Sequence, residues 1–364
     1  MVKRISSSLS SSSSNKLTGL TQAIKDKTRQ LGFVLAGVTS SESSAHFDIF
    51  QGWLDSNHHG TMDYLASERS RSRRADPKLI LPECKSILIL ALPYQKPDLT
   101  GFQKPVRSFP QIAAYALGND YHDVILPRLK EIVQFIEEQV GHPIPNRYYT
   151  DTGPILEREL AQRAGLGWIG KNSMLINPKA GSTFLLAEIL LGIELEQDES
   201  LVTDHCGTCT RCIDACPTNC ILPNRTIDAR RCISFLTIEN KGDIPEDLRP
   251  QMGNWIFGCD ICQQVCPWNR FSLPADPALA PSIPLPTLTD DLILTSSGFN
   301  QRFKHSPIKR AKRRGYLRNL AVVIGNVGTE DDLPFLEEAS KDDEELIRDH
   351  AQWAINKINR RSGF

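Results

Sequence analysis

The sequence lacks any apolar run long enough to cross a membrane. Nowhere in its 364 residues does a stretch approach the roughly 18 uninterrupted apolar residues that a membrane helix needs. The first fifteen residues are basic and rich in serine and contain no apolar segment of the kind that a secretory signal requires. A disordered tail over residues 1–16 explains this composition better than a transit peptide does. We therefore expect a cytoplasmic protein that does not enter the membrane.

The sequence also lacks an overall charge imbalance, since its formal net charge is −1. Charged residues make up 23% and hydrophobic residues 40%, as in an ordinary folded protein. A chain of this length corresponds to about two or three domains. Any argument from charge about a partner must therefore rest on a local segment.

Cysteine is common in only one segment, because nine of the ten lie between Cys206 and Cys266. A first run has the spacing C-x2-C-x2-C-x3-C and ends in proline, as in bacterial ferredoxins, where the fourth cysteine ligates the other cluster. A second run, C-x2-C-x3-C, lacks its first cysteine, and Cys232 is placed upstream to supply it. We predict two [4Fe–4S] clusters, the first held by Cys206, Cys209, Cys212 and Cys266, the second by Cys216, Cys232, Cys259 and Cys262.

Zinc and disulfides are the alternative uses of these cysteines. Zinc sites usually combine C-x2-C with a second such pair or with histidines, which is a different pattern. Disulfides are disfavoured because cytosolic thiols stay reduced. Cys84 and Cys220 are not assigned to either cluster, and we expect both to be buried and inert.

The rest of the chain indicates a mixed α/β fold. Residues 86–92 (SILILAL) and 184–191 (FLLAEILL) are short apolar runs typical of buried strands, and residues 123–140 have apolar positions at helical spacing. Strands and helices in alternation favour an α/β layer architecture. We predict an α/β domain over residues 17–200, a ferredoxin-like module over 201–272, and a linker with a helical domain over 273–364, the linker being proline-rich at 274–286.

The C-terminal segment has a basic part that contains no acidic residue. Residues 292–329 hold eight lysines and arginines and no aspartate or glutamate. A solvated surface is the usual explanation of such a run, but its density also suits the phosphate backbone of a nucleic acid. Residues 316–327 and 347–358 share a spacing of apolar positions, which resembles a pair of HEAT-like repeats.

Two further motifs lie in the α/β segment. Asp151 stands in a turn before a helix, where it is either an N-cap or a proton donor. The glycines of residues 165–172 (GLGWIGKN) allow close approach to a bulky cofactor without forming a nicotinamide fingerprint. Asp120 and His122 have a spacing that could suggest a metal-binding pair, but a lone histidine is more often structural.

These motifs together resemble the epoxyqueuosine reductases, cobalamin-dependent iron–sulfur enzymes of tRNA modification that are related to reductive dehalogenases. The resemblance runs from about residue 17 to the C-terminus, and its most specific parts are YALGNDYH, the Asp151 segment, GWIGKN and GCDICQQVCPWN. It implies a cobalamin cofactor that rests as cob(II)alamin and acts as cob(I)alamin. No glycine follows His122 at the spacing D-x-H-x-x-G, so we do not expect this histidine to ligate cobalt.

The resemblance also implies a reaction and a set of site residues. An epoxide would be reduced to the cyclopentene of queuosine, with electrons passing through the two clusters. Asp151 would be the proton donor, and burial would raise its pKa toward the operating pH. Cobalamin would be contacted by Arg74, Asp151, Lys171, Asn172 and Ser234. The tRNA would be contacted by Lys309, Arg310, Lys312, Arg313, Arg314 and Arg318.

The implied partners are a tRNA with a GUN anticodon that carries epoxyqueuosine, and an external flavodoxin- or ferredoxin-type electron donor. The chain is expected to be a monomer. Two alternatives stay open. A reductive dehalogenase-like enzyme would have no use for the basic helical segment, and a plain electron-transfer protein leaves the Asp151 segment and the glycine-rich loop without a role.

Overall fold

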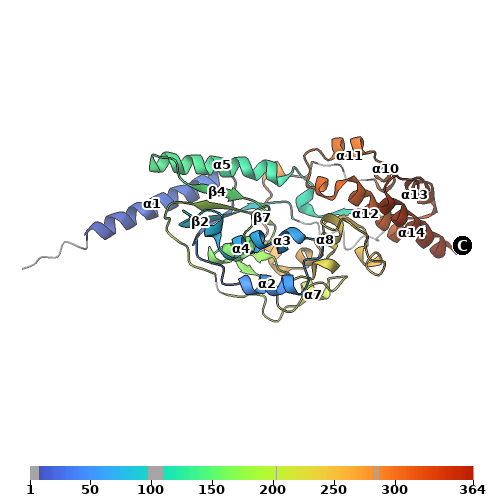
Figure 1. Ribbon diagram of the computed structural model, residues 1–364, viewed down its shortest axis with the longest axis horizontal. Helices are drawn as coiled ribbons and strands as arrows, with labels where there is room; N and C mark the ends of the chain where they lie inside the picture. The colour runs from blue at the N-terminus through green and yellow to red at the C-terminus, as the bar shows by residue number, and fades with distance from the viewer. Residues whose placement is uncertain (1–7, 97–109, 202, 283, 285–286, 364) are drawn as a thin grey trace, which may run out of the picture.

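The computed structural model describes residues 8–96, 110–201, 203–282, 284 and 287–363. A four-stranded sheet has its strands in the order β1-β2-β7-β4, and Figure 1 shows β2, β7 and β4 among the helices that surround them. These strands span Leu35–Ser40, Ser86–Pro93, Phe184–Leu191 and Asn146–Tyr149 in that order. The short pairs β3–β8 and β5–β6 comprise Gln111–Ile112 with Trp255–Phe257 and Trp168–Ile169 with Leu175–Ile176.

The two apolar runs form the central strands β2 and β7, which confirms their prediction. Every residue of β2 is buried, and its side chains alternate between two apolar clusters. Leu88 and Leu90 pack on one side of the sheet, while Ile87 and Ile89 pack on the other. The mixed α/β fold is confirmed, but all pairings in this sheet are antiparallel. Helices covering both faces explain why the two central strands are mostly apolar rather than alternating, with Glu188 as the charged residue of β7.

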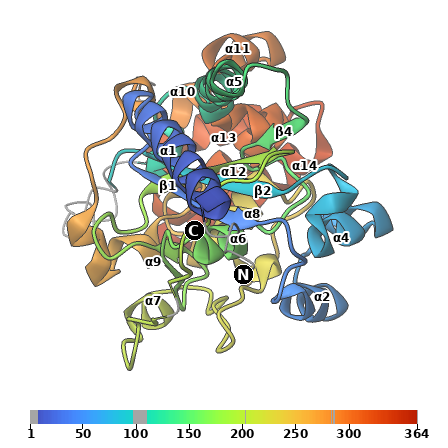
Figure 2. The ribbon, with the colours of Figure 1, turned by 90° about the vertical axis from the view of Figure 1, so that its left-hand side faces the viewer.

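Helices α1 (Ser8–Gln30) and α5 (Tyr121–Val140) cover one face of the sheet, and α6 (Glu157–Arg163) covers the other. Seen end-on, α5 lies above the strands, while α6, α7 (Arg211–Asp214) and α9 (Ile261–Gln264) lie below them (Figure 2). Helix α1 begins at Ser8, and the disordered tail expected over residues 1–16 stays a prediction. Residues 1–7 lie outside the described residues.

Helix α5 confirms the amphipathic helix predicted for residues 123–140. The Asp120 side chain caps its N-terminus by accepting the His122 N–H, and Gly141 ends it in the left-handed conformation at φ 80°. Its buried stripe packs on the sheet through Ile125, Leu129, Ile132 and Ile136. The described residues contain no helix that could span a membrane.

Short helices connected by loops carry the cysteine-rich segment. Besides α7 and α9 it contains α8 (Ile233–Ile238). Helices α2 (Phe47–Asp55), α3 (Asp63–Ala66) and α4 (Glu68–Ala75) lie below the strands in the view of Figure 1, as α7 does.

The C-terminal part is helical, as predicted, and gathers at one end of the molecule (Figure 1). It contains α10 (Leu288–Leu292), α11 (Ser296–Arg302), α12 (Lys312–Val327), α13 (Leu333–Ala339) and α14 (Glu345–Ser362). Helices α12 and α14 share one apolar core, and a Cβ on Gly325 would lie 3.0 Å from the Ala354 Cα, so glycine permits their close approach. A HEAT-like relationship of these helices stays a prediction.

One apolar cluster joins the three predicted segments. It contains Ile112 of the first, Phe257 of the second and Leu320 of the third. The domain boundaries remain predictions, and residues 283, 285 and 286 of the proline-rich linker lie outside the described residues.

Candidate functional site

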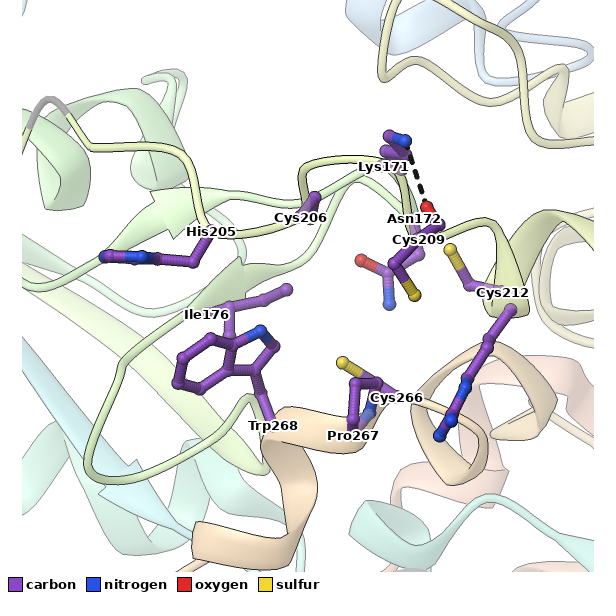
Figure 3. A pocket seen from close by; sticks show the side chains of 11 residues that line it. Lys171, Asn172, Ile176, His205, Cys206, Cys209, Cys212, Cys266, Pro267 and Trp268 are labelled. Carbon is purple, nitrogen blue, oxygen red and sulfur yellow. Dashed lines mark hydrogen bonds between the residues drawn. The ribbon is translucent and has the colours of Figure 1, made fainter.

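Four cysteines from two separate parts of the chain surround one small cavity. Cys206, Cys209, Cys212 and Cys266 line a space of about 50 Å³, and the sulfurs of the last three point toward one another across it (Figure 3). This is the set that the spacing assigned to the first cluster.

Neighbouring side chains hold the loop of this cavity in place. The Lys171 ammonium donates to the carbonyls of Gly207 and Cys209 at 2.7 and 2.9 Å. The Trp168 indole N–H points at the Cys206 sulfur, with 3.5 Å between the two heavy atoms. Such outer contacts orient ligand atoms and tune a bound cluster.

The other four predicted ligands form a second group beside the first. Burial raises the pKa of the Cys262 thiol, and the neighbouring Cys232, Cys212 and Cys216 raise it further. Burial likewise raises the pKa of the Cys259 thiol, and the neighbouring Cys262 and Cys232 raise it further. Crowded, buried thiols lose their protons most readily to a metal centre, because its positive charge stabilises the thiolates.

The two groups fit clusters better than single ions. Among the described residues, no three histidine, cysteine or carboxylate side chains converge closely enough to hold one ion. The first group instead surrounds a space, as ligands at the corners of a larger cluster would. Ligation by the eight individual cysteines stays a prediction.

Cys84 and Cys220 are both buried, as expected, but their surroundings differ. Cys84 lies in the apolar cluster behind the sheet, where burial raises its thiol pKa to about 11. Cys220 lies in the second cysteine group, with its sulfur 3.4 Å from that of Cys216. Its place there was missed because its spacing fits neither ferredoxin run.

A much larger cavity of about 1800 Å³ opens next to the second cysteine group. Its lining includes Cys232, Cys259 and Cys262 together with Asp151 and Tyr121. Ordinary ligand pockets measure about 300–1,000 Å³, so this cavity can take an unusually large cofactor together with a substrate.

Asp151 occupies a strained position in the wall of this cavity. Its backbone has φ 62°, which is uncommon for a residue other than glycine. The Tyr121 hydroxyl donates to the Asp151 Oδ2 at 3.0 Å, and the Asp151 N–H donates to the Glu157 Oε1 at 2.7 Å. The Asp151 side chain is exposed, so its expected burial is wrong.

The residues predicted to contact cobalamin divide between the two cavities. Arg74, Asn172 and Ser234 line the large cavity with Asp151. Lys171 lines the small one and holds the loop around Cys206, and its contact with a corrin stays a prediction. Asn172 borders both cavities.

His122 is held by a neighbour, in keeping with its expected structural role. Its Nδ1 lies 2.8 Å from the Asp120 Oδ1, and this hydrogen bond raises the pKa of His122. The ring also lines the large cavity. Sequence reasoning missed the cavity positions of His122, Tyr121 and Glu157, since only the packing of α5 and α6 around the Asp151 loop reveals them.

The basic residues of the C-terminal part have different surroundings. Lys309 and Arg310 line the large cavity and are exposed, and Lys312 is exposed nearby. Arg313 is paired with Asp342, and Arg314 donates to the Lys241 carbonyl at 2.7 Å.

Arg318 is fully buried, so the prediction that it binds RNA is wrong. Its guanidinium donates to the carbonyls of Leu236, Asn240 and Gly242 at 2.6 to 2.8 Å. These bonds tie α12 to the end of α8 and leave no donor directed at a phosphate.

Comparisons with known proteins agree with this arrangement. A family model described as a 4Fe-4S double cluster binding domain matches residues 205–269, and one described as epoxyqueuosine reductase QueG matches residues 74–152. The chain is 40% identical over 347 residues to an epoxyqueuosine reductase of Pseudomonas aeruginosa, covering 93% of this chain and 94% of the relative.

Two solved structures are similar over most of their length. An epoxyqueuosine reductase crystallised with an epoxyqueuosine-modified tRNA-Tyr stem loop has a TM-score of 0.84 at 32% identity, covering 94% of this chain and 90% of the other. The enzyme of Bacillus subtilis, with its catalytic aspartate loop swung out of the active site, has a TM-score of 0.81 at 31% identity, covering 93% and 90%.

Proposed function

The chain belongs to the epoxyqueuosine reductase family, and on this basis we propose that it reduces epoxyqueuosine in tRNA to queuosine. Two electrons and two protons convert the epoxide to an alkene, and the epoxide oxygen leaves as water. The observation that carries the proposal is the large cavity, where a carboxyl able to donate a proton and cysteines of an electron-carrying group line the same space.

The eight grouped cysteines would hold two [4Fe–4S] clusters, which supply one-electron steps when bound. Cys206 and its group border a small cavity of their own, whereas Cys232, Cys259 and Cys262 border the large one. Electrons would therefore enter at the first group and leave from the second.

The large cavity would hold cobalamin, with Arg74, Asn172 and Ser234 among its contacts. When bound there, the cofactor supplies a strongly reducing cobalt centre for the epoxide carbon. The volume of the cavity and its border with the second cysteine group support this placement of the cofactor.

Asp151 would donate a proton to the epoxide oxygen as the carbon–oxygen bond breaks. The Tyr121 hydroxyl, 3.0 Å from its Oδ2, holds the carboxyl in one orientation. General acid catalysis of this kind lowers the barrier most when the donor is already positioned.

A tRNA with a GUN anticodon would lie across the mouth of this cavity. Lys309 and Arg310 are exposed in its lining, and Lys312 is exposed two residues further along the chain. Arg310 also pairs with Glu239 at 2.8 Å, so the two lysines are the freer partners for phosphate oxygens. The modified base would leave the stack and enter the cavity, as in other enzymes that act on a single base.

An electron donor of the flavodoxin or ferredoxin type would dock at the first cysteine group. Lys171, His205 and Arg211 line that cavity, and no carboxylate is among its described lining residues. A donor with an acidic face would be complementary. A tRNA substrate supports a cytoplasmic location, where the enzyme would act as a monomer.

Complementation tests the proposal. A bacterial strain without its own epoxyqueuosine reductase accumulates epoxyqueuosine in its tRNA, and expression of this chain should convert that nucleoside to queuosine. The Cys266→Ser variant should not restore it. Unchanged epoxyqueuosine with the wild-type chain present, folded and loaded with iron would contradict the proposal.

A further inference from the structure

Two glutamates lie behind Asp151 in a place where ionised carboxylates are costly. Glu188 belongs to the central strand β7 and is 0% exposed. Among the described residues, no N–H or O–H donor reaches its carboxyl oxygens, and the group they meet is the carboxyl of Glu157. Two carboxyls can bond to each other only when one carries a proton, so the pair shares at least one.

Glu157 connects this pair to the proton donor. It is the first residue of α6, and its Oε1 accepts the backbone N–H of Asp151 at 2.7 Å. Asp151 has the left-handed φ of 62°, and strained residues of this kind persist only where their surroundings hold them. The Glu157 carboxyl therefore supports the loop at its strained residue.

The other described contacts of the loop lie to either side of Asp151. The Thr150 hydroxyl donates to the Leu186 carbonyl at 2.8 Å, and the Arg74 guanidinium donates to the Gly153 carbonyl at 3.5 Å. The Tyr121 hydroxyl holds the Asp151 side chain but not its backbone. The Bacillus subtilis relative has its catalytic aspartate loop swung out, so relatives adopt more than one loop position.

We propose that Glu157 is a positioning residue, which keeps the Asp151 loop closed through its bond to the Asp151 N–H and is itself held by a proton shared with Glu188. The inference rests on the proposed role of Asp151 as proton donor. In this arrangement the buried Glu157–Glu188 pair lies behind the proton donor and determines how often Asp151 points into the cavity.

Closure of the loop should depend on pH, with a sign set by the bond that closes it. Burial and the charge of Asp151 raise the pKa of Glu157, whereas the bonds from the Asp151 N–H and Glu188 and the charges of Arg158 and Arg74 lower it. Burial and Glu157 raise the pKa of Glu188. The bond from the Asp151 N–H is stronger to an ionised carboxyl, which is why it lowers the pKa of Glu157. The stability that such a bond gives to the closed loop is lost as pH falls and Glu157 takes up a proton. Opening should therefore increase toward acidic pH.

Hydrogen exchange measures loop opening without using the reaction. The reconstituted protein would be labelled in deuterated buffer from pH 5 to 9, and exchange in a peptide covering residues 150–156 would be read by mass spectrometry. After correction for intrinsic exchange, the wild-type peptide should open more as pH falls.

The Glu157→Ala variant should exchange about tenfold faster, because it loses a hydrogen bond to a partly charged acceptor. Glu157→Gln keeps an acceptor and cannot titrate, so it should exchange at the slow wild-type rate with the pH dependence gone. Glu159→Gln, on the same helix but paired with Arg163 at 3.6 Å, is the matched control and should match wild type.

Unchanged exchange in Glu157→Ala, or a full wild-type pH dependence in Glu157→Gln, would overturn the proposal. If Glu157→Ala does not fold, the pH profile of Glu157→Gln decides alone. Failure of the wild-type chain to reduce epoxyqueuosine would refute the proposed function and leave the exchange result standing, so the two failures are distinguishable.

Discussion

Replacing Asp151 by asparagine tests the proton donor with little change of shape. An amide oxygen can still accept from the Tyr121 hydroxyl, now 3.0 Å from the Asp151 Oδ2, and the backbone N–H can still donate to Glu157. The variant therefore loses the acidic proton and keeps the loop. General acid catalysis contributes about 10²–10⁴-fold, or about 3–5 kcal/mol of barrier at 1.36 kcal/mol per tenfold.

The assay is anaerobic single turnover of epoxyqueuosine tRNA, with enzyme in excess and nucleosides quantified by mass spectrometry. The rate of the chemical step should fall by about 10²–10⁴-fold, while iron content, cobalamin binding and tRNA affinity stay at wild-type values. A rate within about threefold of wild type would refute the assignment of Asp151. An equal loss of tRNA affinity would show that Asp151 binds substrate instead.

Three further predictions concern stability, RNA binding and metal content. Arg318→Ala should lower the free energy of unfolding by about 3–9 kcal/mol in urea, since three buried carbonyls lose their donor at about 1–3 kcal/mol each; a loss no larger than that of Lys312→Ala would contradict this. The double replacement of Lys309 and Lys312 by alanine should weaken tRNA binding and lower the slope of log K against log salt by about 1–2; an unchanged slope would mean that neither contacts phosphate. Cys266→Ser should reduce the iron content of the purified protein, whereas Cys84→Ser should retain all of it; equal iron in both would remove Cys266 from the ligand set.

The parts of the fold that were predictable depend on local patterns. The apolar runs of β2 and β7 and the helical spacing of α5 determine which surface each element buries, so their ranges agreed closely with the structure. The cysteine groups were predictable for a different reason. A cluster requires particular spacings between ligands, and these survive in the sequence even though Cys266 lies 54 positions or more from its partners.

What could not be predicted depends on contacts between distant segments. Arg318 belongs to the same basic run as Lys312, but its three carbonyl acceptors lie more than 70 residues away on α8 and the loop after it. The Glu157–Glu188 pair could not be predicted for the same reason. Glu188 is part of a mostly apolar strand and meets Glu157 only after α6 packs on the sheet. Charge alone does not distinguish a buried, bonded side chain from an exposed one.

The most direct test of the central claim is the cobalamin dependence of turnover by the purified protein. The chain would be reconstituted anaerobically with iron and sulfide, with or without cobalamin, and given epoxyqueuosine tRNA and a strong reductant. The account predicts a nucleoside lighter by one oxygen atom, formed only when cobalamin is present. Equal conversion without cobalamin, or none despite two intact clusters and bound cofactor, would contradict it.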